Sequence, residues 1–189
     1  MMDTRDFVQL TLLAMGGEIQ GKTKLQKTVY FLGVLTGCVD DLGYRPHFYG
    51  PYSDDVADAL GWLRTIGAVD TQSVGAGLVD QSGFEVRRFD YRLNDEGRRF
   101  TAATASRFPD LWVKVKDKAD RLKRIGLPDY LELSIAAKTY FMLQETNGHA
   151  SEGELARLAS RFGWQVSSDQ LKEAAAYLQR LELVQISTT

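Results

Sequence analysis

Apolar positions recur at helical spacing three times in the N-terminal third of the chain, and each run ends at a glycine. The three glycines are Gly16, Gly37 and Gly67. Apolar residues three and four positions apart line one face of a helix, and glycine is common where a helix ends. We therefore expect three helices, defined by Phe7, Leu10, Leu13 and Ala14, then by Leu25, Val29 and Leu32, then by Val56, Leu60 and Leu63.

Residues that cap helices stand at several of the expected starts. Thr23 precedes the second apolar run and Ser53 the third, and the hydroxyl of each can accept from a free backbone N–H. Asn94 is placed to cap a further short helix. Pro109 suits the first turn of a basic helix that continues to about Ile125.

Two strands are predicted after the third helix. Residues 68–74 follow the Gly67 stop, residues 75–83 form a glycine-rich tip, and residues 84–93 carry aromatic side chains on both faces. This composition favours a strand over a helix. Three helices followed by a long hairpin describe a winged helix.

The pattern then appears a second time. Residues 25–33 align with residues 155–163, and residues 53–69 align with residues 168–184, with a shorter loop between the blocks in the second copy. Internal similarity of this kind indicates a repeated structural unit. The expected fold class is mainly α with a small β wing, built from duplicated winged-helix or helix-turn-helix units.

The repeat divides the chain into three parts. Residues 1–105 form an N-terminal winged helix with a long wing hairpin, and residues 106–127 a basic connecting helix. Residues 128–189 form a C-terminal helix-turn-helix or winged-helix-like repeat. Within it we expect helices over residues 133–144, 152–162 and 168–181, and a stub of strand over residues 184–186.

The composition is that of a globular protein of the reducing cytoplasm. The chain has 189 residues, of which 44% are hydrophobic, with a net charge of −2 and a pI near 5.7. Cys38 is the single cysteine, so it has no partner for an internal disulfide. No apolar run approaches the ~18 residues of a membrane span, and no basic leader opens the chain. We expect a cytoplasmic protein without membrane contact.

Positive charge is concentrated in one segment. Residues 86–124 carry twelve Lys and Arg against six Asp and Glu. Arg87, Arg88 and Arg92 lie on the predicted wing, where basic side chains commonly contact the backbone or minor groove of DNA. Lys22, Lys24 and Lys27 either present a phosphate-binding edge near a helix start or form a solvated face. Acidic residues four positions before Arg121 and Arg124 also fit an ordinary solvated helix.

The turn of sequence YGPYS, residues 49–53, has two interpretations. As structure, glycine and proline form a tight turn that leads into the Ser53 cap. As function, His47, Tyr49 and Tyr52 form an aromatic surface for a protein partner. Our hypothesis is that Tyr49 is the core ring and Tyr52 the exposed one.

The segments KTKLQK (22–27), VYFL (29–32) and FYGPYS (48–53) also carry a family resemblance. Together with the helix that ends at Gly67 they resemble the YwgA-like proteins. More remotely they are similar to the SocA-like, or Panacea, antitoxin domain, which pairs a Leu-x-Lys-hydrophobic-Tyr motif with a later Gly-Pro turn. The resemblance implies a small regulatory or defence-linked module.

Catalytic patterns are weak. Gly75 and Gly77 supply two glycines of a dinucleotide loop but lack a βαβ context, and His47 and His149 lack metal-ligand spacing. His47 near Asp54 is more typical of a turn than of an acid–base pair. We predict no enzyme, no cofactor and no metal.

Two functional hypotheses follow. The leading one is a non-catalytic winged-helix regulatory module that binds a protein partner, antitoxin-like or defence-associated. The alternative is a DNA-binding transcriptional regulator that uses the basic wing and the connecting helix. Formation of a homo-oligomer is compatible with both.

Overall fold

The computed structural model of the protein describes residues 3–74, 88–146, 148 and 150–185. Its helices are α1 (Thr4–Ala14), α2 (Lys22–Thr36), α3 (Asp54–Thr65), α4 (Asp95–Arg107), α5 (Pro109–Ile125), α6 (Tyr130–Gln144), α7 (Glu152–Arg161) and α8 (Ser168–Arg180). A short 3-10 helix covers Val39–Leu42, and the strands are β1 (Glu18–Gln20), β2 (Val69–Val74) and β3 (Arg88–Leu93). The expected class, mainly α with a small sheet, is confirmed.

The predicted helix starts are mostly confirmed. The Ser53 hydroxyl accepts from the Val56 backbone N–H at 3.0 Å, and the Asn94 side chain accepts from the Gly97 N–H at 2.9 Å. Pro109 opens α5. The Thr23 cap was wrong, because α2 begins at Lys22 without a side-chain cap.

The sheet explains why α2 starts where it does. Gly21 leaves β1 with a φ of +80°, a backbone conformation that favours glycine, and its N–H donates to the Phe89 carbonyl on β3. The sheet, and not a hydroxyl, therefore fixes the first turn of α2.

The three strands form an antiparallel sheet of order β1-β3-β2. Glu18 pairs with Arg92 on one side of β3, and Thr71 pairs with Tyr91 on the other. Strand β1 was not predicted, because only Ile19 of its three residues is buried and so short a segment shows no alternation. The expected wing tip, residues 75–83, and the strand portion 84–87 lie outside the described residues.

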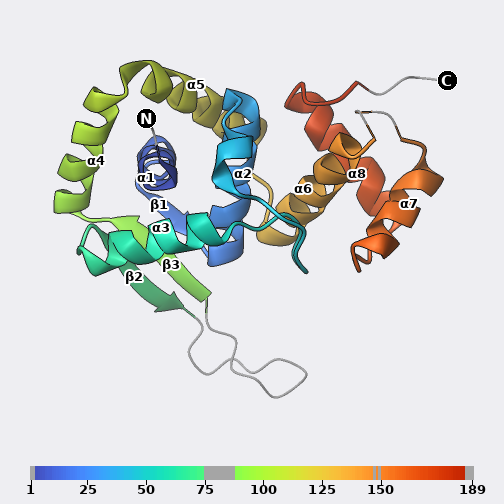
Figure 1. The fold of residues 1–189 in the computed structure, drawn as a ribbon, viewed down its shortest axis with the longest axis horizontal. Coiled ribbons are helices and arrows are strands. Elements are labelled where there is room, and N and C mark those ends of the chain that lie inside the picture. The colour runs from blue at the N-terminus through green and yellow to red at the C-terminus, as the bar shows by residue number, and fades with distance from the viewer. Residues whose placement is uncertain (1–2, 75–87, 147, 149, 186–189) are drawn as a thin grey trace.

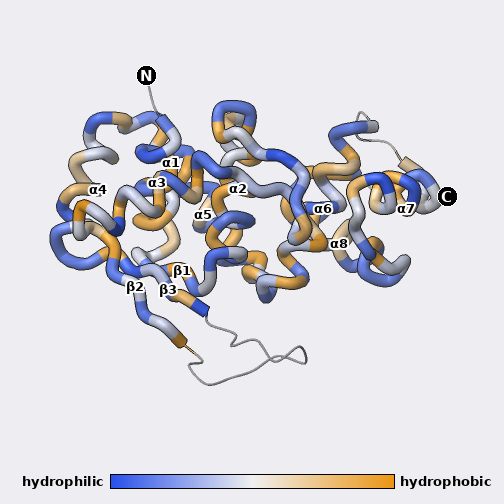
Figure 2. Tube along the Cα trace, turned by 60° about the horizontal axis from the view of Figure 1, so that its bottom comes forward, coloured by the Kyte–Doolittle hydropathy of each residue, from blue (hydrophilic) through white to orange (hydrophobic). Residues whose placement is uncertain are grey.

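Helix α1 forms the centre of the N-terminal half. In Figure 1 it is seen nearly end-on, with α4 and α5 arching around it and α3 and the sheet beneath. Helices α6, α7 and α8 lie beyond α2, and α2 packs against both α1 and α6. In Figure 2 hydrophobic and hydrophilic stretches alternate along the helices from the α4 end to the α7 end, as expected for helices that each bury one face.

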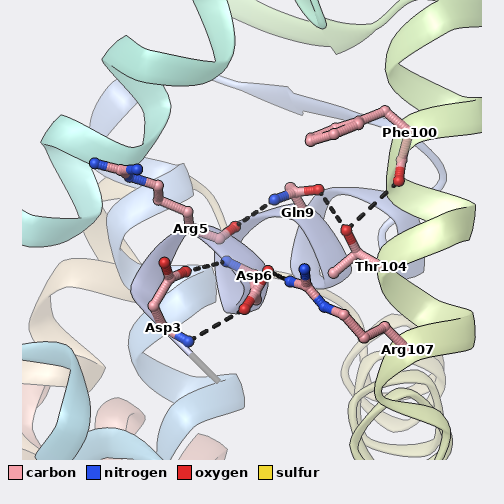
Figure 3. A network of polar contacts seen from close by, with 7 residues as sticks. All are labelled: Asp3, Arg5, Asp6, Gln9, Phe100, Thr104 and Arg107. Carbon is pink, nitrogen blue, oxygen red and sulfur yellow. Dashed lines mark hydrogen bonds and ion pairs between the residues drawn. The ribbon is translucent and has the colours of Figure 1, made fainter. Parts of the chain in front are cut away.

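A polar network fastens α4 to α1 (Figure 3). The Asp6 carboxylate of α1 forms an ion pair with Arg107 at the end of α4. The Thr104 hydroxyl donates to the buried Gln9 side chain at 2.9 Å, and the Gln9 amide donates to the Arg5 carbonyl at 3.2 Å. These polar groups satisfy one another, so we interpret the network as a structural link between the helices.

The C-terminal helices match their prediction with one shift. The cap of α8 is Ser167, whose hydroxyl accepts from the Gln170 N–H at 3.3 Å, whereas the sequence alignment had placed Ser168 opposite the Ser53 cap. Val184 and Gln185 form no strand, and the rest of the expected stub, from Ile186, lies outside the described residues.

Candidate functional site

Two adjacent polar side chains of α2 hold the turn that leads into α3. Gln26 is 1% exposed, and its side-chain amide donates to the Ser53 carbonyl at 2.8 Å while its carbonyl oxygen accepts from the Ser53 N–H at 3.1 Å. The Gln26 side chain thus makes the same two hydrogen bonds to the Ser53 backbone that a residue of a neighbouring β-strand would make. The residue that caps α3 is therefore fixed in place from α2.

Lys27 secures the other half of the same turn. Its side chain is 1% exposed, and its Nζ donates to the Pro51 carbonyl at 2.6 Å. No carboxylate among the described residues forms an ion pair with it. Burial, and to a smaller extent the charge of Lys138, lowers the pKa of Lys27 to about 7.

The prediction that Lys27 contributes to a nucleic-acid surface was wrong. Its side chain lies on the buried face of α2 with Gln26 and Tyr30, so it cannot reach a phosphate. Lys22 is exposed, and its Nζ lies 5.4 Å from the centre of the Tyr52 ring. Lys24 is half-buried.

Further hydrogen bonds make the turn rigid. Arg45 and Tyr52 exchange two backbone hydrogen bonds of 2.9 Å across it. The Tyr44 hydroxyl donates to the backbone carbonyl of Gln26 at 2.7 Å, and the Ser53 hydroxyl donates to the backbone carbonyl of Leu42 at 2.5 Å. Residues 44–53, which we call the anchored turn, are thus fixed at both ends.

The anchored turn carries its apolar rings outward. Phe48 is 81% exposed and Tyr49 is 56% exposed, and His47 is exposed beside them. Tyr52 is half-buried, with its ring 5.1 Å from that of His47. The hypothesis for the two tyrosines was therefore the wrong way round. Tyr52 lies between the His47 ring and Lys22, while Tyr49 sits at the tip.

The anchored turn also contacts the C-terminal helices. The indole N–H of Trp164, which follows α7, donates to the His47 carbonyl at 2.6 Å. Gly50 has a φ of +88°, and a Cβ there would come within 2.9 Å of the Lys138 side chain and 3.2 Å of the Ser134 carbonyl on α6. Only glycine allows this approach. No sequence signal indicated this contact, because 117 residues separate Trp164 from His47.

The predicted wing cations are occupied by ion pairs where the structure describes them. Arg88 donates to both oxygens of Asp90, at 2.9 and 3.0 Å, and Arg92 donates to Glu18 at 2.7 Å. Arg87 lies outside the described residues. These pairs compete with phosphate for the same guanidinium groups.

The basic segment is likewise partly neutralised along α5. Asp120 forms ion pairs with Lys116 and Lys123, and Arg121 forms one with Glu182, which follows α8. The sequence predicted ion pairs of Asp117 with Arg121 and of Asp120 with Arg124, but Asp117 pairs with Lys118 and Asp120 with Lys116 and Lys123. It did not predict the pair to Glu182, which ties α5 to the C-terminal end.

Helix α3 presents acidic side chains to solvent. Asp54, Asp55 and Asp58 are all exposed, and Arg64 is the exposed cation of its last turn. A surface of this sign repels the phosphate backbone of a nucleic acid.

Within the described ranges no three His, Cys, Asp or Glu side chains are grouped so as to hold a metal ion. No helix of that part of the chain is long and apolar enough to cross a membrane. Comparison with models of known protein families found no match, and a search of curated proteins found no significant match.

Proposed function

We propose that the protein is a non-catalytic regulatory module that binds a protein partner through His47, Phe48 and Tyr49 of the anchored turn. The observation that carries the proposal is the pair of exposed rings on a backbone that is fixed from beneath. Exposed aromatic side chains on a preorganised backbone are typical of binding hot spots, because little conformational entropy is lost when the partner docks.

The buried supports strengthen this proposal. Gln26 and Lys27 are polar side chains enclosed in the core, and both donate hydrogen bonds to backbone carbonyls of the anchored turn. Burying an amine is unfavourable unless it gains a hydrogen bond. These supports restrict the backbone that carries Phe48 and Tyr49, which lowers the conformational entropy lost when a partner docks.

A winged-helix origin fits the order of elements. The N-terminal half runs helix, strand, helix, helix, strand, strand, and the strand order is β1-β3-β2. We propose that α1–α3 and α6–α8 are two copies of one helical unit, and that the module is cytoplasmic and antitoxin-like or defence-associated, as the YwgA-like resemblance implies. Superposition of the two helical trios in an experimental structure tests the duplication.

DNA binding is the second proposal, and the basic segment 86–124 favours it. Three features weigh against it: the burial of Lys27, the ion pairs of Arg88 and Arg92, and the acidic face of α3. In a helix-turn-helix the second helix of the motif enters the major groove. Here that helix would be α3, which brings three exposed aspartates to the phosphates.

The partner proposal is tested by replacing the exposed rings. Phe48→Ala combined with Tyr49→Ala should abolish capture of the partner from native lysate, while the melting temperature stays within about 2 °C because neither ring is buried. The matched control is Val113→Ala on α5, an apolar side chain that is 66% exposed far from the turn. Capture should persist in the control.

Retention on heparin separates the two proposals. Phosphate contacts give a steep loss of retention with salt, whereas partner docking does not require any. We expect weak retention that Arg88→Ala with Arg92→Ala leaves unchanged. Capture that survives loss of both rings, together with a steep salt slope that the arginine variant flattens, would replace the partner proposal with the DNA-binding one.

A further inference from the structure

A cleft lies between α2 and α6, next to the start of the anchored turn. Its walls come from α2, the 3-10 helix at Val39–Leu42, the start of the anchored turn, and α6. It encloses about 360 Å³, a volume at the lower end of small-molecule sites. The side chains that carry the argument are Tyr30, Asp40, Arg45 and Tyr140, over an apolar base of Val34, Val39 and Phe141.

Two phenols of this cleft are without hydrogen-bond partners in the described structure. Tyr30 is 3% exposed as a whole, and its hydroxyl, with which no described residue pairs, keeps access to solvent. Tyr140 faces it, with ring centres 6.4 Å apart, and its hydroxyl is likewise unpaired among these residues. By contrast, the third tyrosine, Tyr44, lies 4.9 Å from Tyr30 and donates to the Gln26 carbonyl. The Tyr30 hydroxyl is therefore free to donate a hydrogen bond to a molecule in the cleft.

The protonation of these phenols suits them to donate. Burial raises the pKa of Tyr30, and the neighbouring Tyr140 hydroxyl raises it further. Burial also raises the pKa of Tyr140. Both groups are therefore neutral O–H donors throughout the physiological pH range.

Opposite charges stand at the rim. Arg45 and Asp40 both line the cleft, and neither forms an ion pair within the described part of the chain. A guanidinium suits a carboxylate, and a carboxylate suits an ammonium group. The same cleft thus offers a partner for each sign of charge.

We propose that this cleft binds a small zwitterion of the α-amino acid class with an apolar side chain. Arg45 holds the carboxylate, Asp40 holds the ammonium group, the Tyr30 and Tyr140 hydroxyls complete the polar contacts, and Val34, Val39 and Phe141 contact the side chain. The site is separate from the exposed rings of the anchored turn, so it extends the function beyond partner binding.

The test is a titration of the purified full-length chain with L-leucine, followed by ligand-observed NMR and by the melting temperature. Leucine should bind saturably in the millimolar range or tighter and raise the melting temperature. Two truncated probes of similar shape, 4-methylpentanoate and isopentylamine, each lack one charge. Each should bind at least about tenfold more weakly, as expected when a charged group in the site is left unpaired.

Variants locate the site. Tyr30→Phe removes only the hydroxyl and should weaken leucine binding about tenfold, and Arg45→Gln should weaken it at least as much. The matched control is Tyr177→Phe, because the Tyr177 hydroxyl likewise has no partner among the described residues but is buried on α8, outside this cleft. It should bind leucine as the wild type does.

The proposal is overturned by any of three results. These are no saturable binding of leucine, equal binding of leucine and both truncated probes, or wild-type affinity in both Tyr30→Phe and Arg45→Gln. Because binding is measured without any partner, this outcome is independent of the capture experiment.

Discussion

Gln26 and Lys27 stand side by side on α2, and both use their polar ends to hold backbone atoms of the anchored turn. The two side chains do this in different electrostatic states. Glutamine is neutral at any pH, whereas the amine of Lys27 changes charge near neutrality because burial lowers its pKa to about 7. The stability of the fold should therefore depend on pH through Lys27.

We expect the free energy of unfolding to rise between about pH 7 and about pH 9. In this window the unfolded chain keeps Lys27 protonated, since a free lysine has a pKa near 10.4, while the folded chain has largely released the proton. Stability rises with pH wherever the unfolded state binds more protons, here by up to about 1.4 kcal/mol per pH unit. Urea unfolding of the wild type and of Lys27→Met across this window measures the effect.

The variant should show a flatter profile than the wild type, because methionine does not titrate. The window ends below pH 10, where tyrosines begin to ionise in the unfolded chain and reverse the trend. Parallel profiles for the two proteins would mean that Lys27 is charged in the folded state throughout.

Prediction from the sequence failed most clearly for the environment of individual residues. Helical spacing places Lys24 and Lys27 near one face, and charge suggested that the face was solvated. The spacing does not reveal that the chain folds back at Pro51 and Ser53, packs over α2 and encloses the amine of Lys27. The exchange of Tyr49 and Tyr52 has the same origin, because local polarity does not show which ring meets His47.

At the scale of elements, the helices follow from the sequence because their periodicity and caps are local. Ser53 and Asn94 were recognised as caps from residue type and position alone, and both make the expected hydrogen bonds. Strand β1 and the start of α2 escaped prediction, since both are fixed by pairing with β3 far along the chain.

The two serine N-caps, Ser53 and Ser167, should contribute differently to the free energy of unfolding. Ser53→Ala should lower the free energy of unfolding by about 2 kcal/mol, because the hydroxyl is buried, caps α3 and also donates to the Leu42 carbonyl. Ser167→Ala should cost about 0.5 to 1 kcal/mol, because this cap of α8 stands in solvent. Denaturant unfolding of both variants measures the difference. Equal losses would show that the buried contact to Leu42 contributes nothing.

At the scale of the whole molecule, buried side chains run without interruption from α1 through α2 to α6 and α8. The division at residues 105 and 127 came from the repeat and from composition, which report on local similarity and not on packing. Helix α5 packs on α1 and α2, and its Arg121 reaches Glu182 beyond α8. The link from Trp164 to His47 crosses the same division.

A single cooperative unfolding transition is therefore expected. Differential scanning calorimetry should give a calorimetric enthalpy equal to the van't Hoff enthalpy, which is the signature of one unit. Two resolved transitions would instead establish residues 128–189 as an independent domain.

The chemical reactivity of the Lys27 amine can also report how often the anchored turn separates from α2. At mildly alkaline pH most copies of this amine are uncharged and so nucleophilic, yet the anchored turn covers them. An acylating reagent then modifies Lys27 only in the moments when residues 44–53 lift from α2. The rate of that modification is compared with the rate for an exposed lysine such as Lys114. The ratio measures how often the turn that carries Phe48 and Tyr49 separates from α2.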